Sequence, residues 1–340
     1  MIVPQPFHSI PIQDRGSKLN SGRVLMRCHD SRFPIKAGET MNISEDTFNS
    51  WSKGPSDTET AKCENAETAV RKAIAADSNL QNLDISVFAQ GSYKARTNVR
   101  QNSDVDICVR YNSSFFPEYP QGMTKESFGL VDGTFSFVEF KNLVQQALES
   151  RFGREGVTRG NKAFDVHANS YRIDADVVPT FAHRRYTDRW NHDGTPHFYT
   201  GVAFQPDNGI LVKNWPQHVY DNGVSRNTET GKARKRVVRI MKRLRDKMQA
   251  EQVEGAAGMS SFLLECLVFN APVEVFEHAD YTTIIRDLII KVWNATKAPE
   301  TCSDWVEISK LKGLFRNTQP WTHGQAHSFL QRAWNYIGYK

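Results

Sequence analysis

Residues 91–107 read GSYKARTNVRQNSDVDI, and this stretch decides the fold. It begins with a Gly-Ser pair and ends in an apolar run that carries two aspartates one residue apart, Asp104 and Asp106. The pattern predicts one strand over 85–89, leading into the Gly-Ser pair, and the next over 105–109. Side chains at i and i+2 point the same way from a strand and lie about 6–7 Å apart along it. Both carboxylates are therefore expected on one face of the second strand.

Two such carboxylates can bind divalent metal ions, and bound metal ions assist reactions at phosphate groups. Gly91 lets the backbone approach a phosphate closely because it has no Cβ. Ser92 adds a hydroxyl donor, in a turn whose N–H groups can bind an anion. Alone, a Gly-Ser pair is usually a plain turn, and paired acids on a strand are often only solvated. The combination, with Ser92 twelve residues before Asp104, predicts a site that handles phosphates.

A third acid is expected in residues 171–181, which read YRIDADVVPTF. Asp174 and Asp176 stand at i and i+2 of a strand predicted over 171–178, so both can face the same way. The pattern of residues alone leaves open which of the two binds a metal and which is a supporting or surface group.

Three parts are predicted along the chain, whose 340 residues favour more than one domain. Residues 1–56 are expected to be a covering segment, residues 57–225 a mixed α/β lobe with a mixed central sheet, and residues 226–340 a helical lobe. In the second part we expect helices over 57–77 and 137–153, a long loop over 111–134, a strand over 163–169, and a hairpin of 198–204 with 209–212. In the third we expect helices over 230–250, 260–270, 273–296 and 325–338.

The helix predicted over 230–250 carries a strong local positive charge. Residues 232–247 contain nine Lys or Arg against one acid, Asp246. Most charge runs are solvated helix faces, but a field of this strength would attract triphosphates or a nucleic-acid backbone.

The composition excludes several classes of protein. Hydrophobic residues make up 39% of the chain, which is enough for a sizeable core and too many for a disordered protein. The five cysteines are widely spaced without a CxxC pair, so neither a disulfide framework nor a zinc ribbon is indicated. No stretch approaches the roughly 18 apolar residues of a membrane span, and the first residues lack the apolar region of a signal peptide. A cytoplasmic protein without a membrane partner is expected.

Three short motifs together resemble the signature of DNA polymerase β-type nucleotidyltransferases: Gly91-Ser92, Ser103-Asp104-Val105-Asp106 and Asp176-Val177-Val178-Pro179. The helical half narrows the resemblance. Residues 237–244, VVRIMKRL, resemble the helix that supplies a phosphate-binding lysine, and residues 261–265, SFLLE, resemble the start of the following helix. Together these features are similar to the cGAS/DncV-like nucleotidyltransferases over roughly residues 57–296.

The resemblance implies a polymerase β-like nucleotidyltransferase lobe followed by a helical lobe. It favours Asp176 over Asp174, because the family places its third acid just before a segment of the Val-Val-Pro kind. The residues implied to bind two Mg²⁺ ions, with Mn²⁺ as a substitute, are Asp104, Asp106 and Asp176. The residues implied to hold the donor triphosphate are Gly91, Ser92, Lys242 and Ser261.

For function, the resemblance implies a template-independent nucleotidyltransferase that joins NTPs, ATP among them, into a cyclic di- or trinucleotide. It further implies bacterial antiphage signalling through a separate effector protein. A linear oligoadenylate-like synthase or an RNA-tailing enzyme is the alternative. A non-catalytic RNA- or DNA-binding module that uses the basic helix is a third hypothesis, and it would leave the acids unexplained.

Overall fold

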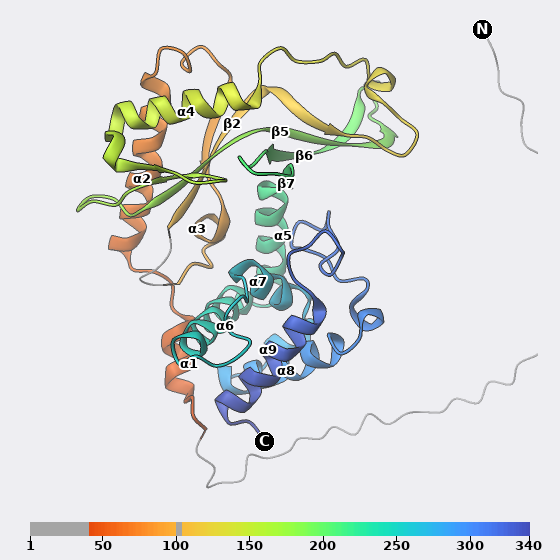
Figure 1. Ribbon diagram of the computed structural model, residues 1–340. Helices are drawn as coiled ribbons and strands as arrows, with labels where there is room; N and C mark the ends of the chain where they lie inside the picture. Colours follow the sequence, from red (N-terminus) through yellow and green to blue (C-terminus); the bar gives the residue numbers. More distant parts are fainter. Residues whose placement is uncertain (1–40, 100–103) are drawn as a thin grey trace, which may run out of the picture. The chain divides into compact units, whose positions relative to one another are not determined.

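The central sheet is built around two parallel strands that carry the acidic motifs (Figure 1). The computed structural model describes residues 41–99 and 104–340. β2 (Val105–Glu118) pairs in parallel with β5 (Ala175–Trp190), and Asp106 stands opposite Asp176 in this pairing. Among the described residues the other strand pairs are antiparallel, so the predicted mixed sheet is confirmed. These strands are β1 (Ile85–Ala89), β3 (Val157–Arg159), β4 (Phe164–Val166), β6 (Pro196–Phe204) and β7 (Val212–Asn214).

One face of the sheet is apolar because Val105, Ile107 and Val109 alternate with the acids along β2. This face packs against α2 (Asp57–Ala76) and α4 (Phe137–Phe152), which lie beside the sheet in Figure 1. Each fully buried side chain of this kind stabilises the fold by about 1.5–3 kcal/mol. Alternation therefore leaves the acids on the opposite face.

The α/β lobe differs from the sequence prediction in two long strands. β2 continues to Glu118, where a loop over 111–134 was expected. Its pairing with β5 shifts between Tyr111 and Phe115, and a bulge of this kind hides the strand period from the sequence. The rest of the expected loop contains one 3₁₀ turn, Lys125–Phe128. β5 begins only at Ala175, so Asp174 precedes the strand instead of lying on it.

The predicted helices of the third part are confirmed, except that the one expected over 273–296 begins only at Tyr281, after a separate 3₁₀ turn, Val273–Phe276. They are α6 (Ala233–Ala250), α7 (Ser261–Asn270), α8 (Tyr281–Ala295) and α9 (His323–Ile337). Sequence analysis missed α5 (Pro216–Glu229), which begins with a proline in its first turn and contacts both β6 and α6. The boundary expected near residue 225 falls inside this helix. No helix within 41–99 and 104–340 is long and apolar enough to cross a membrane.

The expected covering segment contributes a helix to the core of the helical lobe. Residues 1–40 lie outside the described part of the chain, but α1 (Glu45–Ser52) follows them and contacts α6 and α8. Phe48 of α1 is fully buried in the same apolar cluster as these helices. The chain therefore begins its described course in the helical lobe and enters the α/β lobe at α2.

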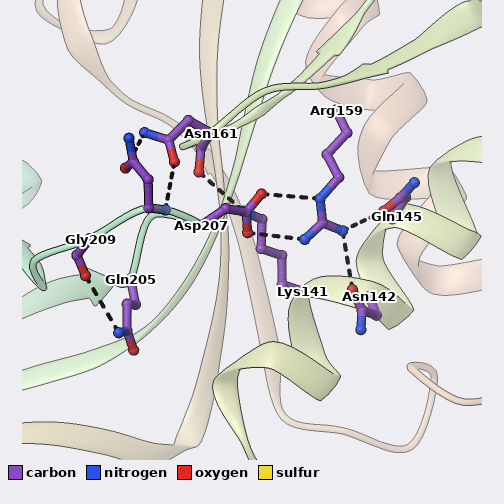
Figure 2. A network of polar contacts seen from close by, with 9 residues as sticks. Lys141, Asn142, Gln145, Arg159, Asn161, Gln205, Asp207 and Gly209 are labelled. Carbon is purple, nitrogen blue, oxygen red and sulfur yellow. Dashed lines mark hydrogen bonds and ion pairs between the residues drawn. The ribbon is translucent and has the colours of Figure 1, made fainter.

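A polar network fixes the connection between β6 and β7 (Figure 2). The Asp207 carboxylate accepts hydrogen bonds from Lys141 of α4 at 2.8 Å and from Arg159 of β3 at 3.1 Å. The backbone N–H of Asp207 donates to the carbonyl of Asn161 at 3.1 Å. The bonds from Arg159 and Lys141 hold the pKa of Asp207 below its usual range. The network thereby anchors the start of β7, which leads directly to Trp215 at the cleft described below.

Candidate active site

The structure brings the three predicted aspartates to one face of neighbouring strands. Asp106 of β2 and Asp176 of β5 are direct partners in the parallel pairing. Asp104 immediately precedes β2, two residues before Asp106, and so shares its face. Neighbouring strands lie about 4.8 Å apart, which sets the lateral spacing of these carboxylates.

Gly91 is required by the Asp106 side chain. It begins α3 (Gly91–Ala95), a short helical segment where an anion-binding turn was predicted, and its φ of +63° favours glycine. A Cβ at this position would stand 2.1 Å from Oδ2 of Asp106. The missing Cβ therefore makes room for a carboxylate, whereas the sequence argument assigned that space to a phosphate. Ser92 follows on α3, and its carbonyl accepts the N–H of Thr97 at 2.9 Å.

Burial and mutual repulsion disfavour the ionised forms of these acids. Burial raises the pKa of Asp106 to about 6, and the neighbouring Asp176 and Asp104 carboxylates add to the effect. The pKa values of Asp104 and Asp176 are also raised, with burial as the largest cause and nearby aspartates as the next. A cation bound here would relieve this repulsion.

Two further aspartates lie nearby. Asp165 of β4 stands opposite Asp176 in the antiparallel pairing, which makes it a fourth carboxylate on this face. Sequence analysis did not single it out, although the alternation of Phe164, Asp165 and Val166 in a predicted strand was the available signal. Asp174 has a different role, because its Oδ1 accepts the backbone N–H of Ala168 at 2.6 Å. This bond ties Asp174 to the β4–β5 connection and favours Asp176 as the third acid of the site.

The donor set fits a hard divalent cation. Carboxylate oxygens are the ligands that Mg²⁺ and similar ions prefer, and the pKa of Asp106 is raised by burial and by neighbouring carboxylates whose repulsion a cation would offset. In the part of the chain that the structure describes, no group of three or more His, Cys, Asp or Glu side chains already converges at coordination distance.

Lys242 lies in a buried cluster that joins the two lobes. Its Nζ donates to Oε1 of Glu265 at 2.6 Å and to the carbonyl of Thr97 at 3.1 Å, and only 2% of the residue is exposed. The Thr97 hydroxyl donates to the same Glu265 oxygen at 2.9 Å. Lys242 is near enough to Asp106 to lower its pKa. The Lys242 charge is thus already paired, and its expected contact with a phosphate stays a prediction.

Ser261 begins α7, as expected from the sequence. Its hydroxyl accepts a hydrogen bond from Nη2 of Arg245 at 3.1 Å, while the neighbouring Ser260 caps the helix by accepting the N–H of Leu263 at 3.0 Å. The predicted contact between Ser261 and a phosphate is likewise untested.

Several cations of the basic helix α6 are also engaged within the protein. Arg234 is 1% exposed, and Arg239 donates to the carbonyls of Ser52 and Arg96. These contacts reduce the positive charge that α6 offers to an external nucleic acid, which weakens the hypothesis of a non-catalytic binding module.

A cavity of about 210 Å³ opens beside Gly91 and Asp106. Its walls come from β2, α3, α5, α7 and the segment before α9, so both lobes contribute. Sequence analysis singled out two of its lining residues. Those that it missed include Lys94, Trp215, Tyr220, Phe262 and Glu307. An acidic face next to such a cleft can hold a phosphorylated substrate with its cation.

Comparison with known proteins identifies the family of this chain. Residues 221–338 match the cGAS/DncV-like nucleotidyltransferase C-terminal helical domain. A cyclic dipyrimidine nucleotide synthase of Legionella pneumophila is 43% identical over 295 residues, which cover 86% of this chain and 97% of that protein. The chain belongs to the cGAS/DncV-like nucleotidyltransferases.

Other members of the cGAS/DncV-like family show the same likeness. A cyclic dipyrimidine nucleotide synthase of Cecembia lonarensis is 39% identical over 295 residues, covering 86% of this chain and 98% of that protein. The solved structure of the Elizabethkingia meningoseptica CdnE cyclic dinucleotide synthase, with GTP and Apcpp, is 33% identical with a TM-score of 0.71. It covers 88% of this chain and 100% of that chain. The predicted family, enzyme class and fold are therefore confirmed. Nucleotidyltransferases of this family generally use divalent metal ions.

Proposed function

We propose that this protein joins two nucleoside triphosphates into a cyclic dinucleotide, and that at least one of its bases is a pyrimidine. The observation that carries the chemistry is the row of carboxylates beside a cleft that both lobes line. The dinucleotide and the pyrimidine are supported by the two relatives named as cyclic dipyrimidine nucleotide synthases.

When bound, two Mg²⁺ ions, which Mn²⁺ could replace, would neutralise the donor triphosphate and make the attacking ribose hydroxyl more acidic. Asp104, Asp106 and Asp176 are the residues that would hold these ions. Asp176, whose pKa is raised by burial and by its neighbours, would accept the proton of that hydroxyl. Catalysis of this kind depends mostly on positioning and on charge neutralisation.

The remaining site residues are proposed to hold the donor phosphates: Gly91, Ser92, Lys242 and Ser261. For Lys242 this requires an exchange of its ion pair with Glu265 for a phosphate. Ser261 can donate its hydroxyl proton to a phosphate while still accepting the bond from Arg245. Gly91 contributes indirectly, through the room that it leaves for the Asp106 carboxylate.

The reaction takes two rounds of the same chemistry. In the first, the ribose hydroxyl of one nucleotide attacks the α-phosphorus of the other, a phosphodiester forms, and pyrophosphate leaves. In the second, the free ribose hydroxyl of the linear product attacks the remaining triphosphate at its α-phosphorus. The ring closes and a second pyrophosphate is released.

A product with two purine bases is the alternative within the same activity, and it would use the ATP expected from the sequence. The structure of the Elizabethkingia relative with GTP and an ATP analogue supports it. A linear oligonucleotide synthase or an RNA-tailing enzyme would use the same acids without the second round.

The test is incubation with each pair of NTPs and Mg²⁺, followed by phosphatase treatment and mass spectrometry. A cyclic product has no terminal phosphate, so it survives phosphatase and has the mass of two nucleoside monophosphates less two waters. A ladder of longer products would favour tailing. Products from which phosphatase removes terminal phosphates would favour a linear synthase. Either outcome contradicts the proposal.

The same proposal gives the biological setting. The product would act as a second messenger that activates a separate effector protein during antiphage defence, in the bacterial cytoplasm where NTPs are made. Purified effector exposed to the enzyme's product, with NTPs incubated with heat-inactivated enzyme as control, would test this partnership.

A further inference from the structure

Lys94 is a cation that the cleft presents on its wall. It lies on α3, three residues after Gly91, and lines the same 210 Å³ cavity as Gly91 and Asp106. It also lines a second cavity of about 580 Å³, whose walls come from α2, α3, α5 and α6. The Lys94 side chain is exposed and stands at the boundary of the two spaces.

The charge of Lys94 is available to a ligand. Its Nζ lies 5.1 Å from the centre of the Tyr220 ring, and no carboxylate of the described residues forms an ion pair with it. A cation over an aromatic face is held more weakly than one in a charge-assisted hydrogen bond. A phosphate can therefore replace the Tyr220 ring as the partner of the Lys94 ammonium. At Lys242 a phosphate would have to displace the buried Glu265 carboxylate.

The Asp106 carboxylate favours a cation at this position. It lines the same cavity as Lys94 and would repel a triphosphate placed there, whereas the other carboxylate of the cavity, Glu307, is paired with Lys312. Lys94 is the cation that lines this cavity among the described residues. Its ammonium offsets the repulsion at the end of the cleft where α3 approaches Asp106.

We propose that Lys94 binds the phosphate groups of the nucleoside triphosphate in the cleft, with Tyr220 holding its side chain in position beforehand. This inference rests on the proposed function and adds to it a substrate-binding residue that comes from the α/β lobe.

The test compares Lys94→Gln with Lys94→Arg and with Lys72→Gln. Lys72 is an exposed residue of α2 that lines neither cavity, so its substitution removes the same charge elsewhere. Loss of one charged hydrogen bond should raise KM for UTP roughly ten- to a hundredfold in Lys94→Gln. Lys94→Arg should keep most of the affinity, and Lys72→Gln should match the wild type.

Inorganic tripolyphosphate separates phosphate binding from base recognition. Its dissociation constant, measured by calorimetry in the presence of Mg²⁺, should rise by the same factor as KM in Lys94→Gln. A folded Lys94→Gln protein with wild-type KM and wild-type tripolyphosphate affinity overturns the proposal. If the wild type makes no product from any NTP pair, the proposed function fails instead. The calorimetric comparison then still decides the role of Lys94.

Discussion

Replacing Asp106 with Asn should make the metal-free protein more stable above pH 6. The Asp106 carboxyl has a pKa of about 6 in the folded protein against an ordinary value of 3.8, because burial and the neighbouring carboxylates disfavour its ionised form. The folded state therefore binds this proton more tightly than the unfolded state. By linkage, the contribution of Asp106 to stability falls as the pH rises between about 4 and 6.

The magnitude follows from the two pKa values. A difference of about two pH units corresponds to about 3 kcal/mol, since one pH unit corresponds to about 1.4 kcal/mol. At pH 8 the ionised carboxylate should therefore cost up to about 3 kcal/mol, which the neutral amide of Asp106→Asn avoids. At pH 4 the carboxyl is mostly protonated, and the two proteins should differ much less.

The assay is urea unfolding of both proteins with EDTA at pH 4, 6 and 8. Addition of Mg²⁺ at pH 8 should then stabilise the wild type and leave Asp106→Asn almost unchanged, because only the wild type retains the full set of ligands. The reasoning is refuted if Asp106→Asn is less stable than the wild type at pH 8 without metal. It is also refuted if the difference between the two proteins does not change with pH.

The remaining predictions distinguish the roles of neighbouring residues in the site. Asp176→Asn should slow pyrophosphate release by about 10²–10⁴-fold through loss of a proton acceptor. Asp174→Asn should slow it less than tenfold, because the Asp174 carboxylate accepts a backbone N–H from Ala168. If Asp174→Asn lowers the initial rate more than Asp176→Asn does, Asp174 is the third acid of the site and Asp176 the supporting residue. Glu265→Gln should destabilise the protein by about 3–5 kcal/mol in urea unfolding, because it leaves the buried Lys242 ammonium without its counter-charge. A loss below about 1 kcal/mol would show that Lys242 finds another partner.

The acidic residues of the site could be predicted from local patterns in the sequence. Asp104 and Asp106 alternate with buried valine and isoleucine, so a single strand fixes their common face. Gly91 was predicted because a glycine lets a phosphate approach the backbone. In the structure the space beside its Cα is occupied by the carboxylate of Asp106, fifteen residues further along the chain, and sequence spacing does not reveal such a contact.

Features that depend on tertiary contacts were not predictable in this way. Lys242 was recognised as a cation near phosphates, but its partner Glu265 lies on another helix and its second contact, Thr97, in the other lobe. Lys94 was not predicted as a site residue, because its contact with the Tyr220 ring of α5 exists only in the folded chain. Extension of β2 was hidden by the bulge after Tyr111, because a shift in register breaks the alternation that marks a strand.

A crystal structure with Mg²⁺ and a non-hydrolysable nucleoside triphosphate tests the central claim most directly. We expect electron density for metal between the carboxylates of Asp104, Asp106 and Asp176, with the triphosphate of the analogue in the cleft beside Gly91. Metal bound elsewhere, or an analogue that leaves these three carboxylates apart and uncoordinated, would contradict the account.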